Sequence, residues 1–191
     1  MRTSRLEAFS DGVIAIIITI MVLEFEMPEG PDWHSLSALA PVFLSYVLSF
    51  VYIAIYWNNH HHLMHVTQSV SGSVLWANMH LLFWLSLVPF TTAWVGAHHG
   101  APLPTAVYGV VLLMAAIAYW ILVQAIVAHE GPRSKLRTAL GSDVKGKISI
   151  VIYAAAVGLA FVNPWISDAL YVAVAAMWIV PDRRIENRVE V

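Results

Sequence analysis

The sequence predicts an all-α integral membrane protein with six transmembrane helices in a single domain, residues 1–191. Of its 191 residues, 59% are hydrophobic, and the mean hydropathy is +0.71. Only 12% are charged, about half the share in a typical soluble domain. A helix needs about 20 apolar residues to cross a hydrocarbon core roughly 30 Å thick. We place the six spans at approximately residues 7–25, 41–64, 74–97, 104–128, 146–163 and 165–181.

The charged residues fall on opposite sides of these spans. If the N-terminus is inside, the inner segments are residues 1–6, 65–73, 129–145 and 182–191. All 10 Lys and Arg residues lie in these segments or directly beside them. The first outer loop instead carries Glu24, Glu26, Glu29 and Asp32, with no basic residue. Because cytoplasmic loops are enriched in Lys and Arg, we predict that both termini are cytoplasmic.

The opening apolar segment has features of both a signal peptide and a retained helix. Arg2 and Arg5 precede it, as basic residues precede a secretory signal core. Its end runs into the acidic and bulky sequence LEFEMPEG, where a cleavable signal would have small residues. We therefore expect this segment to be retained as the first span.

The first span also carries a carboxylate, Asp11. A charged side chain at the bilayer centre costs about 2.5–3.5 kcal/mol on insertion scales, so Asp11 needs a partner or a function. At about 100° per residue, Ile16, Ile20 and Leu23 lie within roughly 60° of one another, and Thr19 borders them. Asp11 lies about 140° from Ile16 and points elsewhere. Periodicity alone fits lipid contact or core packing for this apolar face, and a Thr19 hydroxyl bonded one turn back.

Three segments carry a more specific pattern. The first span opens with R-x-x-x-F-S-D, formed by Arg5, Phe9, Ser10 and Asp11. The sequence YWNNHHHLM ends the second span, and LWANMHLLFWLSLVPFTTAW makes up most of the third. Together they resemble the first three helices of the endosomal and lysosomal potassium channels, transmembrane protein 175 and its prokaryotic relatives. The resemblance is specific as far as residue 97, and beyond it only the hydropathy agrees.

The resemblance implies a potassium channel in which the first helices of four subunits line a central pore. Prokaryotic members have one six-helix unit per chain, which implies a homotetramer in the plasma membrane of a prokaryote. The implied permeant ion is potassium, favoured over sodium, with no cofactor. The implied partners are further copies of the chain, the lipid bilayer and monovalent cations, with no nucleic acid.

The resemblance also assigns roles to individual residues. It makes Ile16 the narrowest point of the pore and adds three further pore residues, Thr19, Ile20 and Leu23. It makes the residues of the opening motif, Arg5, Phe9, Ser10 and Asp11, a structural element that holds the pore helix through hydrogen bonds. An apolar constriction can gate by dewetting, and it differs from a carbonyl-lined potassium filter. The sequence contains no T-V-G-Y-G segment of the kind that builds such a filter.

Further polar residues are candidates around this helix. Asn78 and His80 lie within the third span, so we expect them, or Arg5, to pair with Asp11; simple packing polarity is the alternative. Glu24 follows the apolar face at its outer end. Four copies would concentrate cations at the outer mouth, although a solvated helix-end charge fits equally.

A histidine cluster raises the possibility of an enzyme. His60, His61, His62 and His65 lie together, and His61 and His65 have the i, i+4 spacing that can hold a metal. Membrane di-iron enzymes need several such boxes, but the other doublet, His98–His99, falls on the opposite side of the membrane. We therefore predict no metal site and no enzyme, and expect the cluster to serve pH sensing or packing.

A secondary transporter of a small cation or solute is the alternative function. Such proteins usually contain paired repeats and interrupted helices around a site at the bilayer midplane. Pro89 could kink the third span, but the chain has no matching second half. Asp11 is the clearest candidate for a buried coupling charge.

Overall fold

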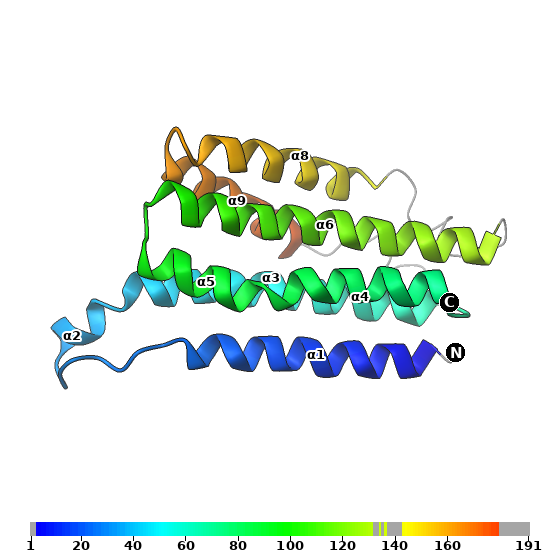
Figure 1. The fold of residues 1–191 in the computed structure, drawn as a ribbon, viewed down its shortest axis with the longest axis horizontal. Helices are drawn as coiled ribbons and strands as arrows, with labels where there is room; N and C mark the ends of the chain where they lie inside the picture. Colours follow the sequence, from blue (N-terminus) through cyan, green and yellow to red (C-terminus); the bar gives the residue numbers. More distant parts are fainter. Residues whose placement is uncertain (1–2, 132–133, 135, 137–142, 180–191) are drawn as a thin grey trace.

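The structure is a computed structural model, and it describes residues 3–131, 134, 136 and 143–179. The described helices lie side by side as an elongated bundle (Figure 1). In chain order they are α1 (Thr3–Leu23), α2 (Trp33–Ser37), α3 (Ala40–Val66), α4 (Gly72–Ser86), α5 (Val88–Ala97), α6 (Pro102–Glu130), α8 (Val144–Leu159) and α9 (Pro164–Ile179).

Four helical segments are long and apolar enough to cross a membrane. They are Thr3–Leu23, Ala40–Val66, Gly72–Ala97 and Pro102–Glu130. Their positions match the first four predicted spans to within a few residues. The predicted spans 146–163 and 165–181 correspond to α8 and α9, which have 16 described residues each. Such a helix is about 24 Å long, shorter than the hydrocarbon core, so the count of six spans stays a prediction.

The third predicted span is interrupted at Leu87, between α4 and α5. Proline has no backbone N–H, so Pro89 cannot donate to the carbonyl four residues earlier. The chain keeps a helical backbone there, and the Leu87 N–H bonds to the Trp84 carbonyl at 3.2 Å. The two helices therefore act as one broken span, as Pro89 indicated.

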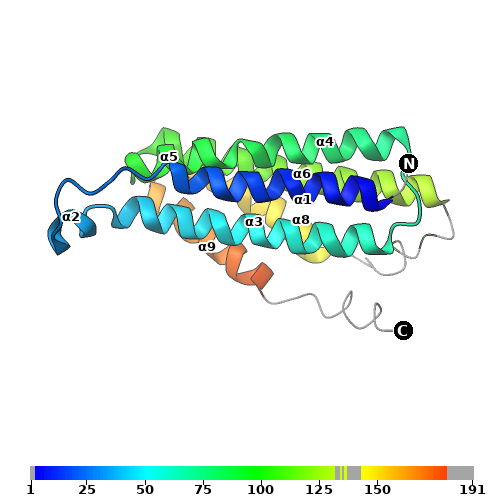
Figure 2. The same ribbon diagram turned by 90° about the horizontal axis from the view of Figure 1, so that it is seen from below.

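The bundle divides into two halves (Figure 1), and in the view from below α1 lies between α3 and the α4–α5 span (Figure 2). On one side, α1 packs against α3, α4 and α5, while α8 and α9 form an antiparallel hairpin against α6 on the other. In the turn between α8 and α9, the Asn163 side chain accepts a hydrogen bond from the Trp165 amide at 3.0 Å. Because α3 and α6 contact helices of both halves, they join the pair.

Each half has its own buried cluster. The first is aliphatic and includes Ile14 and Ile17 of α1. The second is built round tyrosines, Tyr52, Tyr108, Tyr153 and Tyr171. A buried tyrosine needs a partner for its hydroxyl: Tyr52 donates to the Tyr171 carbonyl at 2.6 Å, and Tyr171 donates to the Thr105 carbonyl at 3.2 Å.

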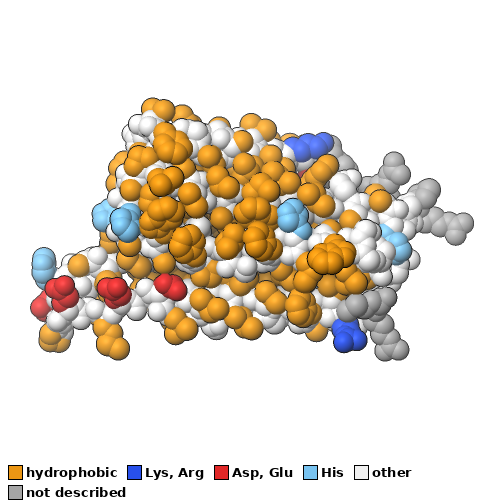
Figure 3. Space-filling model, in the orientation of Figure 1, with side chains coloured by type: hydrophobic (Ala, Val, Ile, Leu, Met, Phe, Trp, Pro, Cys, Tyr) orange, Lys and Arg blue, Asp and Glu red, His pale blue; other side chains and the backbone are white. Residues whose placement is uncertain are grey.

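The described basic side chains and the acidic group near α2 lie at opposite ends of the bundle. Figure 3 shows acidic side chains gathered near α2 and the described Lys and Arg side chains at the opposite end. In the loop before α2, Asp32 accepts a hydrogen bond from the Ser35 amide at 2.8 Å, which lowers the pKa of this exposed carboxyl. The separation has the polarity that the positive-inside rule requires if the α2 end lies outside.

Cysteine labelling should reveal this orientation, because the chain has no cysteine of its own. Ser37→Cys places a thiol on α2, and Ser69→Cys places one at the opposite end, between α3 and α4; both positions are exposed. In intact cells, we expect a membrane-impermeant maleimide to label the Ser37→Cys variant at once and the Ser69→Cys variant only after permeabilisation. The reverse pattern would contradict the predicted orientation.

Candidate functional site

One face of α1 is apolar yet uncovered. The exposed fractions are 58% for Ile16, 40% for Ile20 and 78% for Leu23, although all three are aliphatic. Thr19 is also exposed, and its hydroxyl donates to the Ile16 carbonyl at 2.9 Å. That bond is the one-turn-back contact that periodicity favoured, and it leaves the oxygen lone pairs of Thr19 free to accept.

A groove of about 500 Å³ runs beside this face. Its α1 wall includes Ile16 and Ile20 and ends at Glu24, which is exposed just beyond the helix. Its other wall comes from the broken span, where Pro89 and Phe90 lie. Two of the four predicted pore residues, Ile16 and Ile20, therefore line a concave surface that the described part of the chain leaves open.

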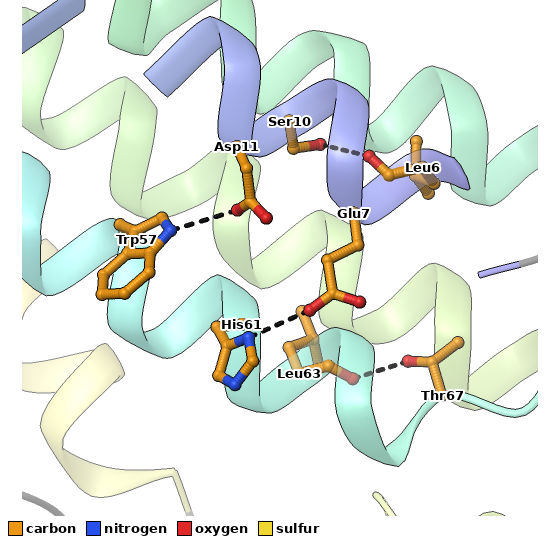
Figure 4. Close-up of polar contacts among 8 residues, drawn as sticks. All are labelled: Leu6, Glu7, Ser10, Asp11, Trp57, His61, Leu63 and Thr67. Atoms are coloured by element: carbon orange, nitrogen blue, oxygen red, sulfur yellow. Dashed lines mark hydrogen bonds and ion pairs between the residues drawn. The ribbon is translucent and has the colours of Figure 1, made fainter. Parts of the chain in front are cut away.

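The buried face of α1 carries a hydrogen-bonded serine. Ser10 is fully buried; its hydroxyl donates to the Leu6 carbonyl at 2.9 Å (Figure 4) and accepts from the Asn78 amide nitrogen at 2.9 Å. The Asn78 oxygen then faces His60 Nε2 at 2.8 Å. Because the amide oxygen can only accept, this pattern assigns the proton to His60 Nε2. The chain of bonds joins α1, α4 and α3.

Asp11 takes a different partner from those predicted. Its carboxylate accepts a hydrogen bond from the Trp57 indole N–H at 3.1 Å (Figure 4), and the residue is half-buried. Asn78 is bonded to Ser10 instead, and His80 accepts from Trp84 within its own helix at 2.9 Å. Successive residues on a helix are about 100° apart, so Ser10 faces α4 while Asp11 faces α3.

The motif arginine is also placed differently from the expectation. Arg5 is exposed, and within the described residues it forms no ion pair with Asp11. Phe9 is 52% exposed and lies about 20° from Ile16 round the α1 axis, on the uncovered face. The buried holding contact of this motif is therefore made by Ser10.

A second contact joins α1 to α3, one turn closer to the N-terminus than Asp11. Glu7 Oε1 lies 2.9 Å from His61 Nδ1, forming an ion pair when the histidine is protonated (Figure 4). Sequence reasoning missed Glu7 and Trp57 as contact residues. The only sequence signal was a matching spacing on the two helices. Glu7 and Asp11 are four residues apart on α1, and Trp57 and His61 are four residues apart on α3, which runs antiparallel to it.

The histidine cluster does not assemble a metal site in the part of the chain that is described. The His61 and His65 rings stack with centroids 6.4 Å apart, and His61 Nδ1 is engaged by Glu7. His60 is turned into the bundle toward Asn78. Among the described residues, no group of three or more His, Cys, Asp or Glu side chains could hold a metal ion.

Replacing the central amide of the buried chain should destabilise the protein. Asn78→Leu leaves the His60 N–H without its acceptor, so we expect a loss of about 1–2 kcal/mol in the free energy of unfolding. The matched control is Asn58→Leu at an exposed position of α3. Thermal unfolding in detergent checks this, and equal melting temperatures for the two variants would contradict it.

Comparison with known proteins places this geometry in a family. The family model of the endosomal/lysosomal potassium channel TMEM175 matches residues 5–89. A potassium channel of Chryseobacterium sp. (strain P1-3) is 54% identical over 187 residues, covering 98% of this chain and 97% of that protein. A potassium channel of Streptomyces collinus is 32% identical over 173 residues, covering 84% of each.

A solved structure agrees with the fold as well. The crystal structure of a lysosomal potassium-selective channel TMEM175 homolog from Chamaesiphon minutus superposes with a TM-score of 0.80 and 28% identity, covering 93% of this chain and 96% of that one. The family and these relatives are ion channels and not enzymes. The chain therefore belongs to the family of the endosomal/lysosomal potassium channel TMEM175.

Proposed function

We propose that the protein is a homotetrameric potassium channel of a prokaryotic plasma membrane, with four copies of α1 lining its pore. The observation that carries the proposal is the uncovered aliphatic face of α1, on which Ile16, Ile20 and Leu23 stand exposed. The other face of the helix is buried and hydrogen-bonded. We infer potassium as the permeant ion because the relatives are named potassium channels.

Ile16 forms the principal constriction in this proposal. A ring of four isoleucine side chains offers no oxygen to replace the water round an ion, so the pore can close by dewetting. An ion that crosses must shed part of its hydration shell, and potassium does so at lower cost than sodium. The ring therefore favours potassium, while the Thr19 oxygens offer a polar surface within the apolar path.

The polar contacts of α1 hold this face in position. Ser10 fixes the helix to α4 through Asn78, and Asp11 fixes it to α3 through Trp57. Along the helix axis, Ser10 precedes Ile16 by about 9 Å and Asp11 precedes it by about 7.5 Å. They prevent rotation of α1, which would turn Ile16 away from the proposed pore axis.

Substituting the constriction should weaken selectivity. In reconstituted bilayers under a potassium/sodium gradient, we expect wild-type current to reverse near the potassium potential. Ile16→Asn places an amide in the ring, so current should grow and the reversal potential should move toward zero, by on the order of tens of millivolts.

The matched control is Ile148→Asn, the same change at an exposed isoleucine of α8, and it should leave the reversal potential unchanged. An unchanged reversal potential in a folded Ile16→Asn variant would contradict the role of this residue. Slow, saturable flux without channel current in any variant would favour the transporter alternative.

The outer carboxylate should act through the local ion concentration. Glu24→Gln removes four charges from the proposed outer mouth, so inward potassium conductance should fall about twofold or more at 10 mM salt. At 1 M salt the Debye length is about 3 Å, and the difference should vanish. Single-channel recording at both concentrations tests this, with Glu29→Gln in the loop as the control; equal conductance of wild type and Glu24→Gln at low salt would contradict it.

A further inference from the structure

Two parallel contacts join α1 to α3, and they differ in chemistry (Figure 4). Asp11 accepts from Trp57 at 3.1 Å, and one turn toward the basic end Glu7 meets His61 at 2.9 Å. The indole N–H of Trp57 keeps its proton throughout the physiological pH range, whereas an imidazole gains one between about pH 8 and 5. Only the Glu7–His61 contact therefore changes its charge with pH.

The Glu7–His61 contact lies on the side of α1 opposite the apolar face. Glu7 precedes Ile16 by nine residues, which places it about 13.5 Å along the axis and about 180° round the helix. A stronger attraction between Glu7 and His61 therefore pulls α1 toward α3. Since Ile16 points the opposite way, this pull withdraws Ile16 from the proposed pore axis.

The His61 side chain is partly exposed to solvent and contacts both Glu7 and Trp57. Its side chain is 47% exposed, and that of Glu7 is 25% exposed. The ring stacks on Trp57 with centroids 6.2 Å apart and an interplanar angle of 23°. Protonation would turn a neutral hydrogen bond into a charge-assisted one and place a cation beside the indole, and both changes strengthen the contact.

Other titratable groups surround His61 but do not form this link. On the facing parts of α1 and α3, the charged and titratable groups near His61 include Glu7, Asp11, His60, His62 and His65. His60 is buried and bonded to Asn78, and Asp11 is bonded to Trp57. Within the described residues, His62 and His65 contact the His61 ring but form no hydrogen bond to α1.

We propose that Glu7 and His61 are positioning residues of the pore helix, and that cytoplasmic protons tighten their contact and raise channel current. The inference rests on the proposed pore role of α1. Protonation of His61 turns its contact with the Glu7 carboxylate into an ion pair, so α1 is held more firmly against α3. At alkaline pH the neutral contact is weaker, and the aliphatic ring closes more often.

The test measures potassium current while cytoplasmic pH changes from 8 to 6 and external pH stays at 7.5. A partly exposed ion pair shifts an equilibrium about two- to fivefold, and we expect wild-type current to rise by that factor. His61→Gln and Glu7→Gln should keep a low, pH-independent current. His61→Arg, with a permanent charge, should keep a high current at both pH values.

The matched control is His65→Gln, which removes a neighbouring histidine that does not reach α1 and should keep the wild-type pH profile. A wild-type profile in His61→Gln, or a flat profile in His65→Gln, would overturn the proposal.

A second measurement is independent of conduction. Between pH 8 and 6, the melting temperature of wild type in detergent should rise relative to that of His61→Gln, because the ion pair forms only in the protonated folded protein. Absence of current in every variant, with this melting difference present, would contradict the proposed channel while confirming the contact. Equal melting shifts in wild type and His61→Gln would overturn the contact itself.

Discussion

The structure depends on satisfying the polar side chains of α1 within a bundle that offers little water. Ser10, Asn78 and His60 are each fully buried, and each has a partner in a chain of bonds across three helices. Leaving one donor unpaired would cost more than a single bond contributes. The chain therefore selects one rotation of α1, since turning the helix by one residue would move every side chain by about 100°.

That rotation explains why α1 can be firmly held and still present an apolar face. Ser10 directs one side of the helix to α4, and Asp11 directs the next side to α3. Met21 continues the buried side toward the outer end. Among the described residues, only the remaining side, which includes Ile16, is left without a packing neighbour. A polar motif at one end of the helix thus determines the direction of aliphatic residues two turns away.

The long helices and the exposed face of α1 could be predicted from the sequence, because hydropathy and periodicity are properties of a single segment. The partner of Asp11 could not be predicted, because pairing across helices depends on their relative rotation and axial offset. From the sequence alone, Asn78 and Trp57 are equally plausible donors. Glu7 carries no local signal either, since a glutamate near a helix start usually stays in solvent. Pro89 was different: a missing backbone donor leaves a local trace, and the break at Leu87 follows from it.

The two buried clusters give the halves of the bundle different mechanical characters. Leu6, Ile14, Ile17 and Met21 of α1 belong to the aliphatic cluster, and none of the described residues of α1 belongs to the tyrosine cluster. A displacement of α1 can therefore slide aliphatic surfaces past one another while Tyr52 and Tyr171 keep their hydrogen bonds. The free energy of local opening differs from one part of a protein to another, up to the free energy of global unfolding. The cost of moving α1 is therefore separated from the cost of breaking the tyrosine cluster, to which α1 does not belong.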